Sequence, residues 1–280
     1  MRDISFDQIA SVVADLSIQA NYELPPDVES ALRRALAEED SPLGRHIIEQ
    51  LIQNFEVAHR EKIPICQDTG ALVCLVELGQ EVHITGGLLT DAINEGVRRG
   101  YQQGYLRKSI VADPLERVNT GDNTPAMIHV DLVEGDRLKL MVAPKGGGSE
   151  NMSKLRFLRP ADGEEGVKKF VIEAVSEAGG NPCPPTTVGV GIGGTFEKAA
   201  FLSKKALFRP IGHHHPDPRY ARLEEELLTA INQTGLGPGA LGGRITALWV
   251  SIETFPCHIT ALPVAVNLNC HAARHREVIL

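Results

Sequence analysis

The fold is best read from the stretch Pro64-Ile65-Cys66-Gln67-Asp68-Thr69-Gly70 and the apolar run Ala71-Leu72-Val73-Cys74-Leu75-Val76 that follows it. The apolar run is rich in β-branched and aliphatic residues, which predicts a buried strand. The polar residues before it therefore lie on a loop that enters a strand, where a rigid element holds side chains in place. A thiol, an amide and a carboxylate stand side by side there. On these residues alone, Cys66 is either a metal ligand or a small core residue.

The composition is that of an ordinary globular protein. The chain has 280 residues, of which 42% are hydrophobic and 23% are charged, enough for one large domain with a substantial core. Its net charge of −8 argues against nucleic acid or an anionic membrane as the main partner. The N-terminus leads directly into an amphipathic pattern, and no apolar run approaches the roughly 18 residues of a membrane span. We therefore predict a cytoplasmic protein.

The cysteines are five in number and widely scattered: Cys66, Cys74, Cys183, Cys257 and Cys270. They contain no C-x-x-C pair, which excludes the motifs of zinc ribbons and ferredoxin-type clusters. In a cytosolic chain they are expected to be reduced thiols.

The first sixty or so residues are expected to be helical. Apolar residues recur at helical spacing from Phe6 to Leu16, and Pro25-Pro26-Asp27 opens a second helix that runs through Glu38. Ser41-Pro42 begins a third helix. The apolar stripes of these helices are typical of core faces. We expect residues 5–59 to form a helical cap or lid on the rest of the chain.

The next segments alternate between strands and helices. A strand at 71–78 is followed by a helix at 88–106, so that Arg107 leaves this helix on a loop. Two alternating segments, Met127–Leu132 and Leu138–Ala143, are joined by turn residues and predict a β-hairpin.

A run of three glycines, in Lys145-Gly146-Gly147-Gly148, follows the second of these strands. Such a run packs no side chains, so it indicates either close approach of the backbone to an anion or a flexible loop. It is not a Walker A motif, because no Gly-Lys-Ser/Thr follows at the required spacing.

The second half of the chain holds three further polar or glycine-rich stretches. Cys183 stands between prolines, in Pro182-Cys183-Pro184-Pro185, which would hold a thiolate ligand stiffly. The glycines of Val188–Gly194 do not have the spacing of a dinucleotide site. His213-His214-His215 lies in a predicted surface loop, and we expect no metal site there because adjacent histidines do not easily converge on one ion. Without repeats or linkers, residues 1–280 are expected to form one continuous domain.

A resemblance to a known family rests on several motifs in order. They are Ile65–Gly70, Asn119-Thr120-Gly121-Asp122-Asn123, Lys145–Asn151, Cys183-Pro184-Pro185 and Asn269-Cys270-His271-Ala272-Ala273-Arg274. Together they resemble the class I, iron–sulfur-dependent fumarate hydratases over most of the chain. The resemblance is to the α subunit of the two-subunit form, which is equivalent to the N-terminal domain of the single-chain form. L-tartrate dehydratase α subunits belong to the same superfamily, but the residues after the triple glycine and around the last cysteine favour fumarate.

The resemblance implies a mixed α/β fold, with sheets flanked by helices and a [4Fe-4S] cluster held on loops. It assigns the cluster to Cys66, Cys183 and Cys270, and leaves Cys74 and Cys257 as packing residues. The implied contacts with a dicarboxylate substrate are Gln67, Asp68, Arg107, His258 and backbone N–H groups near Gly148.

The implied chemistry is the reversible hydration of fumarate to L-malate, a reaction of the tricarboxylic acid cycle. Three thiolates leave one iron without a protein ligand, and that iron can act as a Lewis acid on the substrate hydroxyl. A base must remove the C3 proton, and cations or N–H donors must stabilise the developing charge. Arg107 can pair with a carboxylate in a bidentate fork. Asp68 and His258 are the residues expected to exchange protons or orient the leaving hydroxyl, and the sequence does not decide between these roles.

A second, mobile domain that single-chain family members carry has no counterpart in this sequence. We therefore expect a separate β subunit, an α2β2 assembly, and little or no activity from this chain alone. Two other functions remain open at this point. One is an L-tartrate dehydratase α subunit. The other is an iron or redox sensor with a labile cluster, which would need a partner or a nucleic-acid target.

Overall fold

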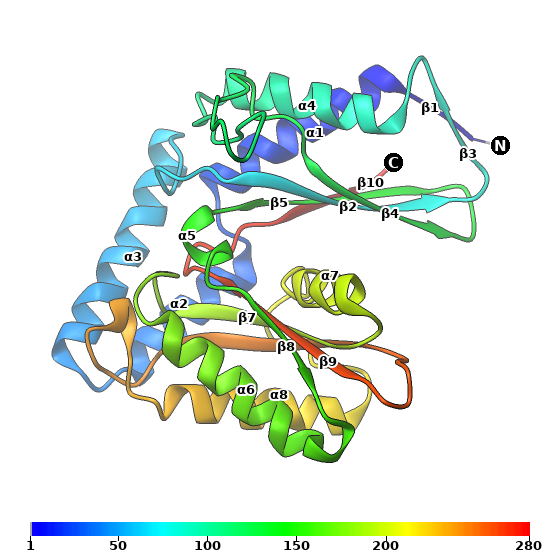
Figure 1. Ribbon diagram of the computed structural model, residues 1–280. Coiled ribbons are helices and arrows are strands. Elements are labelled where there is room, and N and C mark those ends of the chain that lie inside the picture. The colour runs from blue at the N-terminus through cyan, green and yellow to red at the C-terminus, as the bar shows by residue number, and fades with distance from the viewer. Residues whose placement is uncertain (1) are drawn as a thin grey trace. The chain divides into compact units, whose positions relative to one another are not determined.

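The computed structural model describes residues 2–280, which divide into two compact units (Figure 1). Unit 1 comprises the residues up to Pro25, Phe55–Gly147 and Arg274–Leu280. Unit 2 comprises Pro26–Asn54 and Gly148–Ala273. The mixed α/β fold class expected from the sequence is confirmed, because each unit contains a mixed sheet with helices packed against it.

The N-terminal helices form where the periodicity predicts them. They are α1 (Phe6–Tyr22), α2 (Pro26–Glu38) and α3 (Pro42–Glu61). Ser5 caps α1, since its side chain accepts a hydrogen bond from the N–H of Gln8. The expectation that they form one cap or lid is wrong. The helix α1 packs in the core of unit 1, α2 belongs to unit 2, and the residues of α3 are shared between the two units.

Unit 1 is built on a four-stranded sheet in the order β10-β5-β2-β4. Its strands are β2 (Ala71–Gly79), β4 (Met127–Val133), β5 (Leu138–Lys145) and β10 (Arg276–Ile279), and a short parallel pair joins β1 (Arg2–Ser5) to β3 (Val82–Thr85). The helices α1 and α4 (Leu89–Gln103) lie together over one face of this sheet (Figure 1). The strand predicted at 71–78 is therefore an interior strand, as its apolar run requires.

The predicted hairpin between residues 127 and 143 does not form. Both strands exist, but β2 lies between them, parallel to β4 and antiparallel to β5. A tight turn between two alternating segments favours a hairpin locally. Here the nine-residue apolar strand β2 supplies a more buried partner to both strands, and this non-local pairing prevails.

Two glycines of α4 allow it to pack closely on α1. A Cβ at Gly96 would lie 2.6 Å from the carbonyl oxygen of Ala10, and one at Gly100 would lie 2.8 Å from that of Ala14. The helix backbones therefore approach each other without side chains between them at these points. The core of unit 1 surrounds this contact and includes Tyr101, which is completely buried.

Unit 2 is built on a second four-stranded sheet, in the order β6-β9-β7-β8. Its strands are β6 (Lys154–Leu158), β7 (Thr186–Gly193), β8 (Ala247–Phe255) and β9 (Leu262–Asn269). Figure 1 shows α6 (Gly163–Ala178) and α8 (Pro218–Asn232) on one face of this sheet and α7 (Phe196–Ala206) on the other. The short helix α5 (Gly147–Glu150) and the 3-10 turns Pro160–Asp162 and Pro238–Ala240 lie in connecting segments.

The glycine-rich strand β7 has a packing function. A Cβ at Gly189 would lie 2.1 Å from the carbonyl oxygen of Ser203, and one at Gly191 would lie 2.2 Å from that of Ala199. Both acceptors belong to α7, so the glycines let this helix lie directly on the strand. This contact explains the glycine pattern without a dinucleotide.

A buried carboxylate joins the end of α2 to the loop before β8. Glu39 is 2% exposed, and its oxygens accept hydrogen bonds from the N–H groups of Ser41, Arg244 and Ile245 at 2.8–3.0 Å. Burial by itself would raise the pKa of Glu39, but the N–H donors, that of Arg244 foremost, outweigh it and hold the pKa below its usual range. Glu39 thus fixes the loop as an ionised group.

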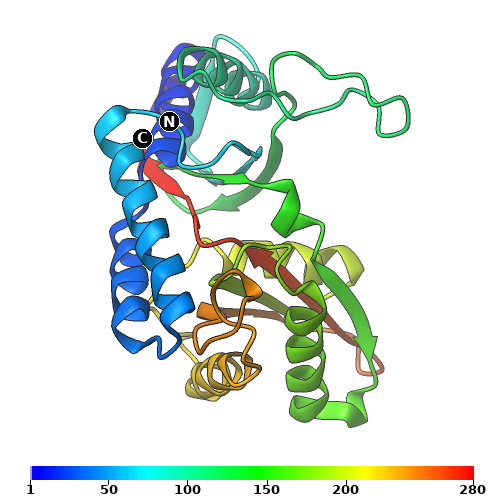
Figure 2. The same ribbon diagram turned by 90° about the vertical axis from the view of Figure 1, so that its left-hand side faces the viewer.

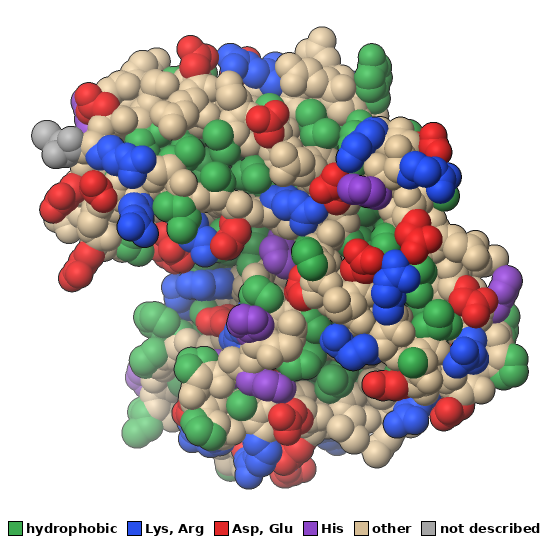
Figure 3. Space-filling model, turned by 180° about the vertical axis from the view of Figure 1, so that it is seen from behind, with side chains coloured by type: hydrophobic (Ala, Val, Ile, Leu, Met, Phe, Trp, Pro, Cys, Tyr) green, Lys and Arg blue, Asp and Glu red, His purple; other side chains and the backbone are tan. Residues whose placement is uncertain are grey.

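The surface shown in Figure 3 carries Lys and Arg side chains interspersed with Asp and Glu. Among the residues described, no helix has the length and apolar character needed to cross a membrane.

Candidate functional site

The Cys66–Gly70 loop of unit 1 turns back on itself around the cysteine. The side chain of Cys66 is partly exposed, and its Sγ accepts a hydrogen bond from the N–H of Asp68 at 3.4 Å. The thiol in turn donates to Oε1 of the exposed Gln67 at 3.3 Å. A backbone N–H directed at sulfur stabilises a thiolate, so this loop is suited to present Cys66 as a ligand.

The carboxylate of Asp68 is held by two backbone donors. The N–H of Gly70 donates to Oδ1 at 3.0 Å, and the N–H of Gly147 donates to Oδ2 at 2.8 Å. A Cβ at Gly146 would lie only 3.2 Å from the same Oδ2. Of the two alternatives left open for the triple glycine, the structure supports close approach of the backbone to an anion, and within unit 1 that anion is the Asp68 side chain.

Two buried side chains support the loop from below. The hydroxyl of Tyr101 donates to the carbonyl oxygens of Thr69 and Gly70 at 2.7 and 2.9 Å, and the amide of Asn123 donates to the Gly70 carbonyl at 3.1 Å. Burial raises the pKa of Tyr101, and the nearby Arg274 opposes that increase. Tyr101 therefore acts as a neutral donor that fixes the loop.

A backbone contact holds Arg107 beside the Cys66–Gly70 loop. Its carbonyl accepts a hydrogen bond from the hydroxyl of Thr69 at 2.9 Å, and its side chain is exposed. The segment that follows is anchored by Asn123, whose Oδ1 accepts from the N–H of Ser109 at 2.6 Å. Figure 2 shows the long connection from α4 to β4 extending away from the rest of unit 1. Arg107 stands at the base of this connection.

Arg274 is a buried charge beneath the loop. It is 2% exposed; Nη1 donates to Oδ1 of Asn21 at 3.0 Å and Nη2 donates to the carbonyl of Asp68 at 2.9 Å. Its Nε is buried and has no hydrogen-bond partner among the described residues. Within residues 2–280 no Asp or Glu carboxylate forms an ion pair with it.

Unit 2 brings Cys183 and Cys270 close to each other. His271, the residue after Cys270, donates its backbone N–H to the carbonyl of Cys183 at 3.3 Å, and its Nδ1 lies 3.2 Å from the same oxygen. Cys183 is exposed and adopts a left-handed backbone with φ of 56°. Such a conformation costs free energy for a residue other than glycine and concentrates at functional sites.

Gly148 lies near this pair of cysteine loops. A Cβ on it would lie 3.3 Å from the carbonyl oxygen of Asn181, two residues before Cys183, so a larger residue would crowd the loop. Three of the predicted site residues of unit 2, Gly148, Cys183 and Cys270, therefore share one region.

His258 lies at the opposite end of the same sheet. Cys270 follows the last residue of β9, which pairs with Thr187 at the start of β7, whereas Phe255, just before the His258 turn, pairs with Gly193 at the end of β7. Six strand steps separate these ends, a distance of about 20 Å. Within unit 2 the structure thus does not bring His258 to the cysteines.

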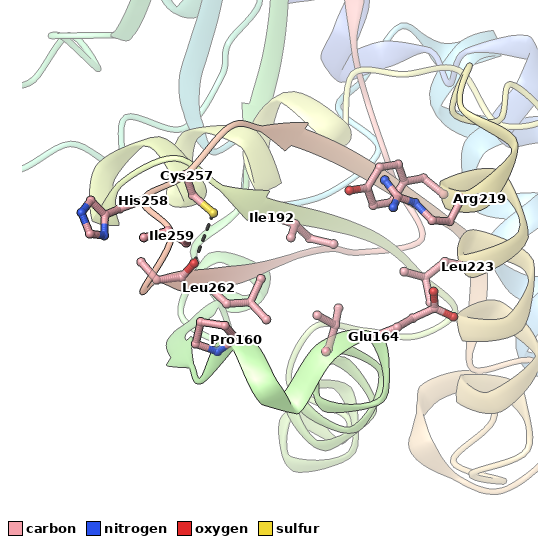
Figure 4. A pocket seen from close by; sticks show the side chains of 13 residues that line it. Pro160, Glu164, Ile192, Arg219, Leu223, Cys257, His258, Ile259 and Leu262 are labelled. Carbon is pink, nitrogen blue, oxygen red and sulfur yellow. Dashed lines mark hydrogen bonds between the residues drawn. The ribbon is translucent and has the colours of Figure 1, made fainter.

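A pocket of about 380 Å³ adjoins the His258 turn (Figure 4). Ile192, Leu223 and Leu262 lie at its apolar side, with Arg219 and Glu164 at its edge. The ring of His258 is at the margin, turned away from these residues, and its Nδ1 lies 2.9 Å from Oγ1 of Thr260. The pocket is an amphipathic hollow that holds no other predicted site residue.

The two remaining cysteines differ from each other. Cys74 is completely buried on β2, where desolvation raises the pKa of its thiol to about 12, so its assignment as a packing residue is confirmed. The same assignment for Cys257 is wrong. Cys257 is exposed on the turn beside His258, and its thiol donates to the carbonyl of Ala261 at 3.2 Å.

The histidine cluster lies on a surface loop, as predicted. His214 approaches Oε2 of Glu224 at 3.2 Å and packs on Trp249 with 4.8 Å between ring centroids. His215 packs edge-on against Tyr220. These side chains are thus held by neighbours in unit 2. No group of three or more His, Cys, Asp or Glu side chains in metal-holding geometry is found among the described residues.

Comparison with known proteins gives a match over nearly the whole chain. The family model of fumarate hydratase (Fumerase) matches residues 10–279. The chain belongs to this family. This fumarate hydratase family also takes in L(+)-tartrate dehydratases, and its members are iron–sulfur-dependent hydro-lyases of class I.

Relatives of the chain within the family carry the name of one subunit. A Methanocaldococcus jannaschii protein, provisionally named L(+)-tartrate dehydratase subunit alpha, is 42% identical over 274 residues, which is 95% of each chain. The L(+)-tartrate dehydratase subunit alpha of Escherichia coli O157:H7 is 34% identical over 278 residues, covering 98% of this chain and 91% of its own. That of Escherichia coli K12 is 33% identical over 278 residues.

The donor groups fit the iron–sulfur group of the family. Three thiols lie on exposed or partly exposed loops, unlike the buried Cys74, and one of them already accepts a backbone N–H. A buried guanidinium with an orphaned Nε stands beneath the Cys66 loop, as expected where negative charge is to be bound.

Several supporting residues were not predicted from the sequence. Asn21, Tyr101, Asn123 and Arg274 hold the Cys66–Gly70 loop through contacts that join distant parts of the chain. Asn123 and Arg274 do stand in the motifs that carry the resemblance, which was a usable signal. Nothing in the local sequence around Asn21 or Tyr101 distinguishes them from other helix residues.

Proposed function

We propose that this chain is the α subunit of an iron–sulfur hydro-lyase that removes water from a four-carbon hydroxy-dicarboxylate, with L(+)-tartrate as the preferred substrate. The single observation that carries the proposal is the Cys66–Gly70 loop. It sets a thiol that can bind iron beside a carboxylate that two backbone N–H groups orient. The names of the relatives support tartrate in preference to the fumarate predicted from the sequence.

In this proposal Cys66, Cys183 and Cys270 hold a [4Fe-4S] cluster. When bound, the cluster supplies an iron without a protein ligand, a Lewis acid for the substrate hydroxyl and the adjoining carboxylate. Every other step falls to the protein. Asp68 exchanges the C3 proton, on the carbon adjacent to the one that bears the departing hydroxyl, since its carboxylate is fixed but remains partly exposed.

The substrate carboxylates require donors, and three groups are proposed for them. The amide of Gln67 and the guanidinium of Arg107 are exposed at the loop, and the N–H of Gly148 is exposed near Cys183. Arg107 can form a bidentate pair with a carboxylate and so distinguish a dicarboxylate from a monocarboxylate.

A separate β subunit is proposed as the partner, in an α2β2 assembly. The relatives are named as alpha subunits, which supports a second kind of chain. We propose that residues 1–280 act together as one functional domain of that assembly, and that turnover requires the partner.

His258 is proposed to contact substrate held by a different copy of the chain. The resemblance assigns it to the site, yet it lies about 20 Å along the sheet from Cys183 and Cys270. The substrate contact and the distance are compatible if the exposed His258 of each copy contacts the substrate bound by a neighbouring copy. Mixing an inactive Asp68→Asn protein with an inactive His258→Ala protein should then restore activity through mixed assemblies. A mixture that stays inactive after subunit exchange would refute the shared site.

The second candidate substrate pair is fumarate and L-malate, favoured by the description of the matching family model. The two are separated by assaying the anaerobically purified holoenzyme. Formation of oxaloacetate from L(+)-tartrate is compared with loss of fumarate absorbance. A kcat/KM at least about tenfold higher for tartrate, roughly 1.4 kcal/mol in transition-state binding, supports the proposal. Equal or higher values for fumarate support the second candidate, and turnover of neither, with a bound cluster, would favour a sensor.

Asp68→Asn tests the catalytic assignment. The amide is isosteric but cannot accept a proton, so kcat should fall by about 10²–10⁴. The cluster absorbance should stay at the wild-type level. Loss of the cluster in this variant would instead show that Asp68 has a structural role. The control is Glu81→Gln, which changes an exposed carboxylate of unit 1 outside the loop. It should leave kcat and the cluster absorbance unchanged.

A further inference from the structure

The burial of the Arg274 guanidinium is not explained by its hydrogen bonds alone. The side chain is buried, and its two terminal nitrogens donate to neutral oxygens, those of the Asn21 amide and the Asp68 backbone. A neutral amide such as glutamine can donate to two such acceptors without bringing a charge into the interior. A buried charge without an opposite charge is costly, so burial of a guanidinium here requires a compensating anion.

The residues around Arg274 in the described part of the chain do not supply that anion as a direct ion pair. No carboxylate among residues 2–280 pairs with Arg274, and its Nε has no partner. Arg276, two positions along, shows the ordinary arrangement: its guanidinium lies 3.5 Å from Oε2 of Glu23. The two arginines therefore differ, since Arg276 has a carboxylate within ion-pair distance and Arg274 has none among residues 2–280.

The position of Arg274 identifies what it faces. Its Nη2 holds the carbonyl of Asp68, and the N–H of the same residue points at the Cys66 sulfur. The guanidinium thus lies behind the short segment that presents the thiol and the oriented carboxylate. Asn21 joins this arrangement, because its backbone carbonyl accepts from the N–H of Ile65 at 2.9 Å.

We propose that Arg274 is a positioning residue for the site. It holds the Cys66–Gly70 loop through the Asp68 carbonyl, and its unpaired charge stabilises the negative charge that this loop binds. This inference rests on the proposed function, in which three thiolates and a dicarboxylate bring that negative charge. The charge acts through space from behind the loop, and Arg274 itself does not touch the reacting atoms.

Three substitutions in the holoenzyme separate charge from shape. Arg274→Gln removes the charge. Arg274→Lys keeps the charge but not the forked geometry. Asn21→Asp leaves the guanidinium in place and sets a carboxylate beside Nη1, which is now 3.0 Å from the Asn21 oxygen, so the charge is neutralised by a new ion pair. Arg276→Gln is the matched control, because it removes a charge that is already paired.

The readouts are the cluster signal in electron paramagnetic resonance, its midpoint potential, and the Kd for L(+)-tartrate or L-malate from the shift of that signal. We expect Arg274→Gln and Asn21→Asp to raise Kd by about tenfold, roughly 1.4 kcal/mol, and to lower the potential, because a nearby cation stabilises added negative charge. The Kd and the midpoint potential of Arg274→Lys should lie between those of these two variants and those of wild type. The Kd of Arg276→Gln should stay within about twofold of the wild-type value.

Wild-type Kd and potential in Asn21→Asp would overturn the inference, even if Arg274→Gln failed to fold, because this variant retains the guanidinium and its hydrogen bond to the Asp68 carbonyl. Equal changes in Arg276→Gln would also overturn it, since they would show a general effect of charge. If the wild-type holoenzyme itself binds no cluster or no dicarboxylate, the proposed function fails first, and the two failures are thereby distinguished.

Discussion

Replacing Glu39 with glutamine should destabilise unit 2 and change its response to pH. The carboxylate accepts four hydrogen bonds at 2.8–3.0 Å from three N–H groups, of which that of Ile245 is buried and those of Ser41 and Arg244 are partly buried. Glutamine keeps one acceptor oxygen and turns an NH₂ donor toward the other N–H groups, so one or two of them lose their acceptor. A buried donor left unsatisfied costs about 1–3 kcal/mol. We therefore expect the free energy of unfolding to fall by about 3 kcal/mol at pH 7.

The chain offers a convenient probe and a matched control for this measurement. Trp249, the single tryptophan of the sequence, lies in unit 2 and reports its unfolding in urea by fluorescence. Glu38→Gln makes the same change of charge on the exposed neighbouring residue and should stay within about 0.5 kcal/mol of wild type.

The pH dependence gives a second check on Glu39. The pKa of the folded state lies below the usual value of about 4.3, so the stabilisation is present above that value and is lost as the pH falls through the folded pKa. The difference between wild type and Glu39→Gln should therefore shrink below about pH 4. A difference under 1 kcal/mol at pH 7, or one that is the same at pH 7 and pH 3, would refute the reasoning.

Two further predictions concern the other features of the fold. Asp122→Asn should cost about 2 kcal/mol at pH 7, because burial would raise the pKa of Asp122 but Thr124 and Arg98 lower it to about 2. In thermal unfolding that cost should disappear between about pH 4 and pH 2, and a cost that persists there would contradict it. Gly191→Ala should cost about 3 kcal/mol by Trp249 fluorescence, since the new Cβ would lie 2.2 Å from the carbonyl oxygen of Ala199 in α7; a loss below 1 kcal/mol would mean that α7 moves aside freely.

The elements that the sequence predicts correctly are those decided by local signals. The helix from Pro26 to Glu38 begins at a proline in its first turn and carries an apolar face, and both features lie within a few residues of each other. The predicted hairpin failed for the opposite reason. Which strand lies between β4 and β5 depends on β2, some 50 residues earlier in the chain, and nothing in the turn between them records that choice.

The site divides in the same way. Cys66, Asp68 and the glycines after Lys145 stand out in the sequence because their motifs are continuous, and the structure places Asp68 and Gly147 in direct contact. The side chains that hold the loop are single residues on distant elements. Tyr101 is indistinguishable from a core aromatic until its hydroxyl is seen on the carbonyls of the loop.

The path of the chain through the two units sets an order of events during synthesis. Cys66 leaves the ribosome well before Arg274 and β10, both parts of unit 1, which are made only after the whole of unit 2. At roughly 5–20 residues per second, some 200 residues separate the loop from its arginine by about 10–40 seconds. During that interval the thiol stands on a loop without its guanidinium support. A nascent chain should therefore acquire its mature Cys66 loop only after Arg274 has been made, and cluster insertion by the cell would be best timed after that point.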